Sequence, residues 1–171
     1  MRLLVQRVAQ AEVRRADGRR DGDPHPPSAA NPSDPTSDVG DVVGRIGRGL
    51  LVLVGVAPGD GDGEVAWAAA KLLGMRVFAD GEGKMNLDLA AVGGEVLVVS
   101  QFTLYGDLRG GRRPGFSAAA APGDAERIYL ALVERLRSHG ANVATGAFGR
   151  AMHVASINDG PVTLWLDSAE R

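Results

Sequence analysis

The chain has 171 residues, of which 44% are hydrophobic and 23% charged, and its formal net charge is −2. This length fits one globular domain with a single core. The absence of cysteine excludes disulfides, thiolate metal sites and cysteine nucleophiles. A slightly acidic chain does not grip nucleic acid over its whole surface, although a local basic patch is allowed. The sequence has no apolar run long enough to cross a bilayer and no secretory signal, so we expect a cytoplasmic protein with no membrane partner.

The first two predicted elements are strands at residues 3–9 and 42–46, with a long insertion between them. Residues 16–38 contain no Val, Ile, Leu, Met, Phe, Trp or Tyr, while five of the nine prolines fall here. Such a segment cannot bury enough apolar surface to offset the entropy of ordering it. We therefore expect a mobile insertion at 16–38 that extends a hairpin, within a single domain of residues 1–171.

A continuous apolar run at residues 49–56, bounded by glycine and rich in valine, predicts a central strand buried on both faces. After a Pro-Gly-Asp break, Asp62 can cap a helix that ends at Gly74. The apolar positions of this helix follow helical spacing: Val65, Ala68, Ala69, Leu72 and Leu73. Residues 75–78 are expected to be extended and to precede a glycine-rich turn at 80–83.

The second half of the chain continues with strands around one further helix. Residues 96–99 predict a buried strand, and residues 122–140 predict a second amphipathic helix. Two more strands are expected at 152–157 and 162–166, joined through Asn-Asp-Gly-Pro at 158–161. The predicted fold class is α+β: a single domain in which a mixed, mostly antiparallel sheet curls toward a barrel and is covered by two amphipathic helices.

Ser100, Gln101, Phe102 and Thr103 follow the strand at 96–99 directly and form the first candidate catalytic segment. A strand that ends there presents hydroxyls, an amide and several backbone N–H groups at the rim of the sheet. Backbone N–H groups can stabilise the tetrahedral oxyanion of an ester without any ionisable side chain. The segment therefore favours ester hydrolysis driven by the main chain.

The alternative is a nucleophilic Ser100 assisted by a histidine. The chain offers His25 in the insertion, His139 at a helix end and His153 on a strand. A structural role is the simpler interpretation for each of them. No Gly-x-Ser-x-Gly elbow surrounds Ser100, so a serine triad has little support in the sequence.

Gly160 and Pro161 are the second candidate, because proline between strands is tolerated mainly at turns, edges and special backbone geometries. Base rates favour a simple turn with a trans bond. A glycine before the proline also leaves two carbonyl groups unobstructed as acceptors for a substrate amine. Arg7 is the third candidate: alternation puts it on the apolar face of its strand, where it either snorkels to solvent or binds carbonyls such as those near Gly160.

Arg109, Arg112 and Arg113, spaced by glycines in a loop at 106–115, form the best basic patch. They are candidate contacts for nucleic-acid phosphates, and the alternative is a solvated loop. The sequence shows no cluster of metal ligands and no cofactor motif, so we expect no metal and no cofactor.

Six segments, taken in order, resemble the D-aminoacyl-tRNA deacylase family, also called D-tyrosyl-tRNA deacylases. These segments are residues 5–8, 49–56, 83–87, 100–107, 111–114 and 158–163, and the match covers nearly the whole chain except the insertion. The resemblance implies hydrolysis of D-aminoacyl-tRNA, and of mischarged glycyl-tRNA, in a homodimer that receives the acceptor end of the tRNA.

The resemblance also implies a role for each candidate residue. The Gly160-Pro161 bond would be cis and enter the active site of the partner subunit, where its two carbonyls admit a D side chain or glycine and exclude an L side chain. Arg7 would hold this clamp. Residues 100–103 would line the pocket for the terminal adenosine and the ester, with the ribose 2′-hydroxyl assisting attack by water and the backbone N–H of Thr103 stabilising the oxyanion.

The chain departs from the family pattern at three places. The insertion is longer than usual, Gly115 stands where serine is common, and Ala147 stands where arginine is common. Two other functions stay open from the residues alone: a non-catalytic nucleic-acid-binding module, which should be richer than 5% in aromatic residues, and a serine esterase that uses Ser100.

Overall fold

The computed structural model describes residues 1–16 and 41–171. Nearly all of the predicted insertion, including His25, therefore lies outside the described residues. The elements follow the order β1 (Arg2–Arg15), β2 (Val42–Ile46), β3 (Gly49–Gly55), α1 (Asp62–Gly74), β4 (Phe78–Ala79), β5 (Met85–Leu87), η1 (Ala90–Val92), β6 (Glu95–Ser100), η2 (Phe102–Tyr105), α2 (Pro122–Ser138), β7 (Asn142–Thr145), β8 (Met152–Asp167) and η3 (Ser168–Glu170). Within the described ranges, no helix is long and apolar enough to cross a membrane.

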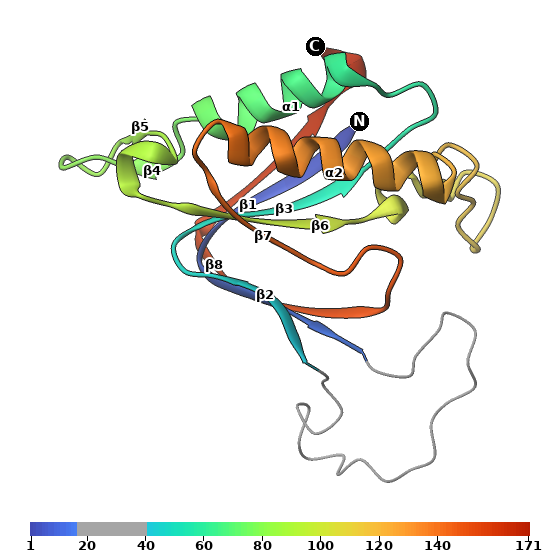
Figure 1. Cartoon of the computed structure of the whole chain (residues 1–171), viewed down its shortest axis with the longest axis horizontal. Helices are drawn as coiled ribbons and strands as arrows, with labels where there is room; N and C mark the ends of the chain where they lie inside the picture. The colour runs from blue at the N-terminus through green and yellow to red at the C-terminus, as the bar shows by residue number, and fades with distance from the viewer. Residues whose placement is uncertain (17–40) are drawn as a thin grey trace, which may run out of the picture.

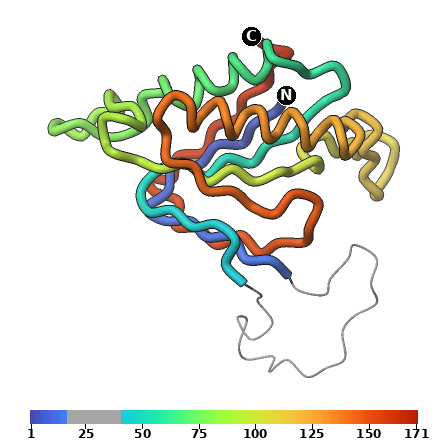
Figure 2. Tube along the Cα trace, in the orientation of Figure 1, coloured from blue at the N-terminus to red at the C-terminus, as the bar shows by residue number. Residues whose placement is uncertain are grey.

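The main sheet is mixed and has the order β2-β1-β3-β6-β7, with β8 also paired to β1. The strand β1 is antiparallel to β2, β3 and β8, whereas β6 is parallel to both β3 and β7. In Figure 1 the helices α1 and α2 lie over one face of this sheet, and in Figure 2 the traces of β1 and β8 run side by side. The predicted fold class, including the hairpin of β1 and β2, is confirmed.

Close approach between strands curls the sheet toward a barrel. A Cβ atom built on Gly44 of β2 would lie 2.4 Å from the carbonyl oxygen of Thr145 in β7, at the opposite end of the strand order. A Cβ atom on Gly49 of β3 would lie 1.9 Å from the carbonyl oxygen of Glu95. Only glycine fits at both positions: Gly44 allows the two ends of the sheet to come together, and Gly49 allows the close pairing of β3 with its neighbour β6.

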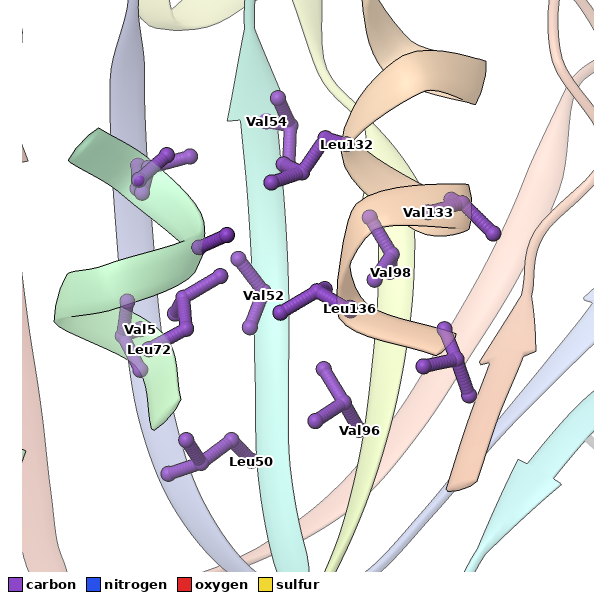
Figure 3. Packing of buried hydrophobic residues seen from close by; sticks show 14 of the residues in the cluster. Val5, Leu50, Val52, Val54, Leu72, Val96, Val98, Leu132, Val133 and Leu136 are labelled. Atoms are coloured by element: carbon purple, nitrogen blue, oxygen red, sulfur yellow. The ribbon is translucent and has the colours of Figure 1, made fainter. Parts of the chain in front are cut away.

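The main core fills the space between the helices and the sheet. Alternate residues of β3 and β6 face the helices, and Leu72 of α1 and Leu132 of α2 pack onto them (Figure 3). The other face of the same two strands supplies Leu51 and Leu97 to a second buried cluster inside the curled sheet. The continuous apolar run of β3 is thus explained by burial on both faces, as predicted.

Three local predictions need comment. Asp62 does not cap α1: Gly61 holds the N-cap position without a side-chain hydrogen bond, and the Glu64 carboxylate accepts from its N–H at 2.9 Å. The two strands expected at 152–157 and 162–166 form one strand, β8, because β1 is long enough to pair with both. The segment at 75–78 becomes a strand only from Phe78, where β4 begins.

Candidate active site

The segment Ser100 to Thr103 lies where β6 leaves the sheet. Ser100 is still paired with Val54, and the Gln101 N–H donates to the Val54 carbonyl at 2.7 Å. The chain then turns into η2, whose Tyr105 is buried. This anchor at the end of η2 leaves Phe102 and Thr103 exposed at the rim of the sheet, with Phe102 51% exposed.

Two backbone N–H groups are free at this rim. The Leu104 N–H donates to the Gln101 carbonyl at 3.2 Å, but those of Phe102 and Thr103 have no acceptor among the described residues. The Thr103 hydroxyl accepts a hydrogen bond from Gln101 Nε2. The arrangement offers two adjacent N–H donors and a hydroxyl oxygen that is already hydrogen-bonded.

Two hollows adjoin the segment and share Ser100, Gln101, Phe102 and Gly149 in their walls. The first has a volume of about 360 Å³ and walls that are mainly apolar and aromatic. The second has a volume of about 570 Å³ and also reaches Thr103 and the start of β8. A ligand seated on residues 100–103 can therefore extend into both.

Aromatic side chains from distant parts of the chain enclose the first hollow. Phe102 and Phe116 meet edge to face with ring centroids 4.9 Å apart, and Tyr129 lies 5.7 Å from Phe148. The Tyr129 hydroxyl donates to the Val98 carbonyl at 2.8 Å, and burial raises the pKa of this hydroxyl to about 12. Tyr129 is therefore neutral at physiological pH, and the hollow suits a flat, uncharged ring.

Arg7 binds the irregular part of β8. Gln6 pairs with Thr163 and Val8 pairs with Asn158, so residues 159–162 bulge opposite Arg7. The Arg7 guanidinium donates through Nε to the Asp159 carbonyl at 3.0 Å and through Nη1 to the Val77 carbonyl. The predicted contact of Arg7 with carbonyls near Gly160 is thus present, and its side chain is only 11% exposed.

The Gly160-Pro161 bond inside this bulge is cis, as the family resemblance implies, and is not the trans bond that base rates favour. Gly160 has φ +124°, and a Cβ atom there would lie 2.7 Å from Arg7 Nη2. Asn158 also supports the bulge, because its Oδ1 accepts from the Val162 N–H at 3.1 Å. Gly160 and Pro161 are exposed and line neither hollow, so within one chain they are not brought together with residues 100–103.

The loop at 106–115, which carries the three arginines, is closed at its base by two backbone hydrogen bonds between Asp107 and Gly115, both 2.8 Å. Arg109 is bound to the Asp107 carboxylate, with Nη2 and Oδ2 2.7 Å apart. The hydrogen bonds from Arg109 lower the pKa of Asp107 to about 2. Arg112 and Arg113 are exposed in the same loop. The cations available to a ligand there are therefore mainly Arg112 and Arg113.

Neither of the two described histidines lies in a place where it could assist Ser100 as a base. His139 ends α2, where its Nδ1 lies 2.8 Å from the Arg135 carbonyl. His153 is exposed on β8, and alternation directs it away from the face on which Met152 and Val154 line the second hollow. Neither can act as a base for Ser100 in this arrangement. In the part of the chain that is described, no group of acidic and histidine side chains could hold a metal ion.

Sequence reasoning missed four residues of the site. Phe116, Tyr129 and Phe148 form the aromatic hollow, and Arg150 lines the second one. They lie on separate loops and on α2, so no local spacing marks them as a group. The only sequence signal for the three aromatic residues was their rarity, because the whole chain has only four phenylalanines and two tyrosines, and Arg150 had no such signal.

Comparison with known proteins gives sequence and structure matches over nearly the full length of the chain. Residues 4–167 match the family model described as D-Tyr-tRNA(Tyr) deacylase. A D-aminoacyl-tRNA deacylase of Desulfitobacterium hafniense is 47% identical over 168 residues, which cover 98% of this chain and 97% of the relative. A D-aminoacyl-tRNA deacylase of Anaeromyxobacter dehalogenans is 49% identical with the same coverage. A solved structure of a c-Myc DNA Unwinding Element Binding Protein is 33% identical, covers 98% of this chain and 99% of its own, and has a TM-score of 0.80.

These matches identify the chain as an enzyme of the ester hydrolase class. More specifically, the chain belongs to the D-Tyr-tRNA(Tyr) deacylase family. The family and the enzyme class predicted from the sequence are confirmed.

Proposed function

We propose that this protein hydrolyses the ester bond of D-aminoacyl-tRNA, and of mischarged glycyl-tRNA, and releases free amino acid and tRNA. One deacylase domain of residues 1–171 carries out the reaction in the cytoplasm, where aminoacyl-tRNA is made and used. The observation that carries the proposal is the pair of free N–H groups of Phe102 and Thr103 at the mouth of an aromatic hollow. Family membership supports the choice of substrate.

The aromatic hollow is the proposed site of the terminal adenine. Stacking on aromatic rings binds a base through its face and needs no charged side chain in the wall of the hollow. Phe102, half exposed and in contact with Phe116, is the ring best placed to stack. With the base there, the ribose and its ester lie against residues 100–103.

The proposed chemistry uses the main chain and the substrate itself. Water adds to the ester carbonyl, and the oxyanion accepts hydrogen bonds from the N–H groups of Phe102 and Thr103. The bond to the ribose oxygen then breaks, that oxygen takes up a proton, and the neighbouring 2′-hydroxyl assists the attack. Thr103 acts through its N–H, consistent with a hydroxyl already bound by Gln101.

Chiral selection is assigned to the carbonyl groups of Gly160 and Pro161. They point into the active site of a partner subunit in a homodimer, where they accept from the substrate amine and leave no room for an L side chain. Their exposure, and their absence from both hollows of their own chain, support a role across an interface. Arg7 holds the bulge that carries them.

The exposed apolar surface of β8 supports the homodimer. Val154, Ile157, Leu164 and Trp165 are large apolar side chains that remain 37–55% exposed on this one strand. Apolar side chains gathered on one element favour association with another protein surface. The same strand carries Gly160 and Pro161, so a dimer formed there would bring them to the partner.

Contact with tRNA beyond the terminal nucleotide is assigned to Arg112 and Arg113, with Arg109 already bound by Asp107. A contact confined to the acceptor end agrees with the net charge of −2. A non-catalytic nucleic-acid-binding module would not need the free N–H groups beside the hollow. A serine esterase would need a base near Ser100, which neither described histidine supplies.

The test is a comparison of four substrates under one set of conditions: D-tyrosyl-tRNA, L-tyrosyl-tRNA, glycyl-tRNA and a simple aryl ester. We expect hydrolysis of the D and glycyl substrates only. Equal rates on the D and L substrates would overturn the chiral selection. Hydrolysis of the aryl ester alone would support a serine esterase, and binding of tRNA without any turnover would support the non-catalytic module.

A further inference from the structure

Arg150 is a cation in the wall of the second hollow, on the turn that precedes β8. It follows Gly149, which has φ +69°, and its own N–H donates to the Ala147 carbonyl at 3.3 Å. The side chain is exposed and has no ion pair or hydrogen bond within residues 1–16 and 41–171. Its charge is therefore available to a ligand.

Among the described residues, no side chain of opposing charge lines the hollow around Arg150. Its other wall residues are apolar or neutral: Val99, Ser100, Gln101, Phe102, Thr103, Gly149, Ala151, Met152 and Val154. Arg2 and Arg109 differ from Arg150 in this respect, since Arg2 pairs with Asp167 at 2.9 Å and Arg109 pairs with Asp107. The second hollow is therefore a region of uncompensated positive charge beside residues 100–103.

We propose that Arg150 binds the phosphate on the 5′ side of the terminal nucleotide. This assignment rests on the proposed function. The base occupies the aromatic hollow and the ester lies on the N–H groups of residues 102 and 103, so the ribose spans the wall that the two hollows share. The 5′ phosphate then extends into the second hollow, where Arg150 is the one charged side chain of the wall.

The chemistry of the guanidinium matches this ligand. Its planar N–H groups bind phosphate oxygens in pairs, and they are less strongly hydrated than an ammonium group. The protonated amine of an aminoacyl ester is repelled by the same charge, so the amino acid is directed away from Arg150. The second hollow thus fixes which way the nucleotide enters, with its phosphate toward β8.

The test uses two minimal substrates, 3′-O-D-tyrosyl-adenosine with and without a 5′ phosphate. We expect the wild-type protein to show a kcat/KM about tenfold higher for the phosphorylated substrate, because charged hydrogen bonds to a phosphate contribute free energy of that size. Arg150→Ala should hydrolyse both substrates equally, and Arg150→Lys should restore part of the preference. Arg127→Ala, which removes an exposed arginine from α2 outside both hollows, should keep the full preference.

Salt dependence provides a second readout with D-tyrosyl-tRNA. Loss of one phosphate contact should reduce the slope of log kcat/KM against log salt concentration by about 0.7 in Arg150→Ala, and leave it unchanged in Arg127→Ala. A 5′ phosphate preference that persists in Arg150→Ala, or that is absent from the wild type while D-tyrosyl-tRNA is hydrolysed, would refute the assignment. Failure of the wild type to hydrolyse any D-aminoacyl ester would instead refute the proposed function. The thermal midpoints of the variants show whether they are folded.

Discussion

Replacement of Arg7 by alanine tests how the Gly160-Pro161 bulge is held. The guanidinium donates to the carbonyls of Asp159 and Val77 and lies 3.2 Å from the Asp159 carboxylate. Arg7 is nearly buried, so both carbonyls would lose a charged donor in a poorly solvated place. The Asp159 side chain is 47% exposed, so its ion pair adds little.

The expected loss in the free energy of unfolding is about 3 kcal/mol, because charged hydrogen bonds contribute about 1.5–3 kcal/mol each and the carbonyls regain part of this by hydration. Domains of this kind have a stability of about 5–15 kcal/mol, so the variant still folds. The bulge is no longer fixed, and a misplacement of about 1 Å in a positioning group lowers the rate about a hundredfold. Arg7→Lys keeps the charge but has no planar fork to reach two carbonyls, and it should not restore the rate.

Urea unfolding and kcat/KM for D-tyrosyl-tRNA measure both effects. Arg127→Ala is the matched control, since an exposed arginine on α2 should change the free energy of unfolding by less than about 0.5 kcal/mol. Wild-type turnover in Arg7→Ala would show that Arg7 does not support the site. Full rescue by Arg7→Lys would show that its charge matters and its two hydrogen bonds do not.

Three further predictions concern single residues. Thr103→Ala should keep kcat within about tenfold in a single-turnover assay, because only one neutral hydrogen bond is lost; loss of all turnover in a folded variant would make the hydroxyl a nucleophile. Gly160→Ala should lower the free energy of unfolding by about 1–3 kcal/mol and weaken discrimination between D and L substrates, because φ is +124° and the new Cβ meets Arg7; unchanged urea unfolding and D/L ratio would contradict this. The pKa of the Tyr129 hydroxyl is near 10 in the unfolded chain and about 12 in the fold, so the free energy of unfolding of the wild type should fall as pH rises above 10. In Tyr129→Phe, the free energy of unfolding measured with urea should fall less over the same pH range. An equal fall in the two proteins would refute this.

Much of the fold could be predicted because its strands are encoded by local patterns. β3 and β6 are buried on both faces, which requires a continuous apolar run, and α1 and α2 carry apolar residues at helical spacing. β8 was divided wrongly because Gly160-Pro161 is typical of a break between strands. Pairing with the long β1 on both sides of the bulge outweighs that local signal.

The site could be predicted only where its residues are contiguous. Residues 100–103 and 160–161 each stand out as polar or proline-containing ends of apolar runs. Phe116, Tyr129 and Phe148 do not, because they come together only when α2 and the loops pack over the end of β6. Arg150 was missed for the same reason: its lack of a partner among the residues that the structure describes is a property of the folded surface.

The most direct test of chiral selection across an interface is complementation between two defective subunits. Gly160→Ala displaces the bulge and with it the carbonyls that accept from the substrate amine, so it should lower turnover of D-tyrosyl-tRNA as well as D/L discrimination. Phe102→Ala impairs the aromatic hollow and should also lower this turnover. When the two subunits are mixed after unfolding and refolded together, each mixed dimer contains one intact site, made from Phe102 of one chain and Gly160 of the other. We expect activity on D-tyrosyl-tRNA to recover to about a quarter of the wild-type value. No recovery beyond the sum of the two variants, with mixed dimers shown to form, would mean that each subunit uses its own Gly160 and would contradict the proposed clamp.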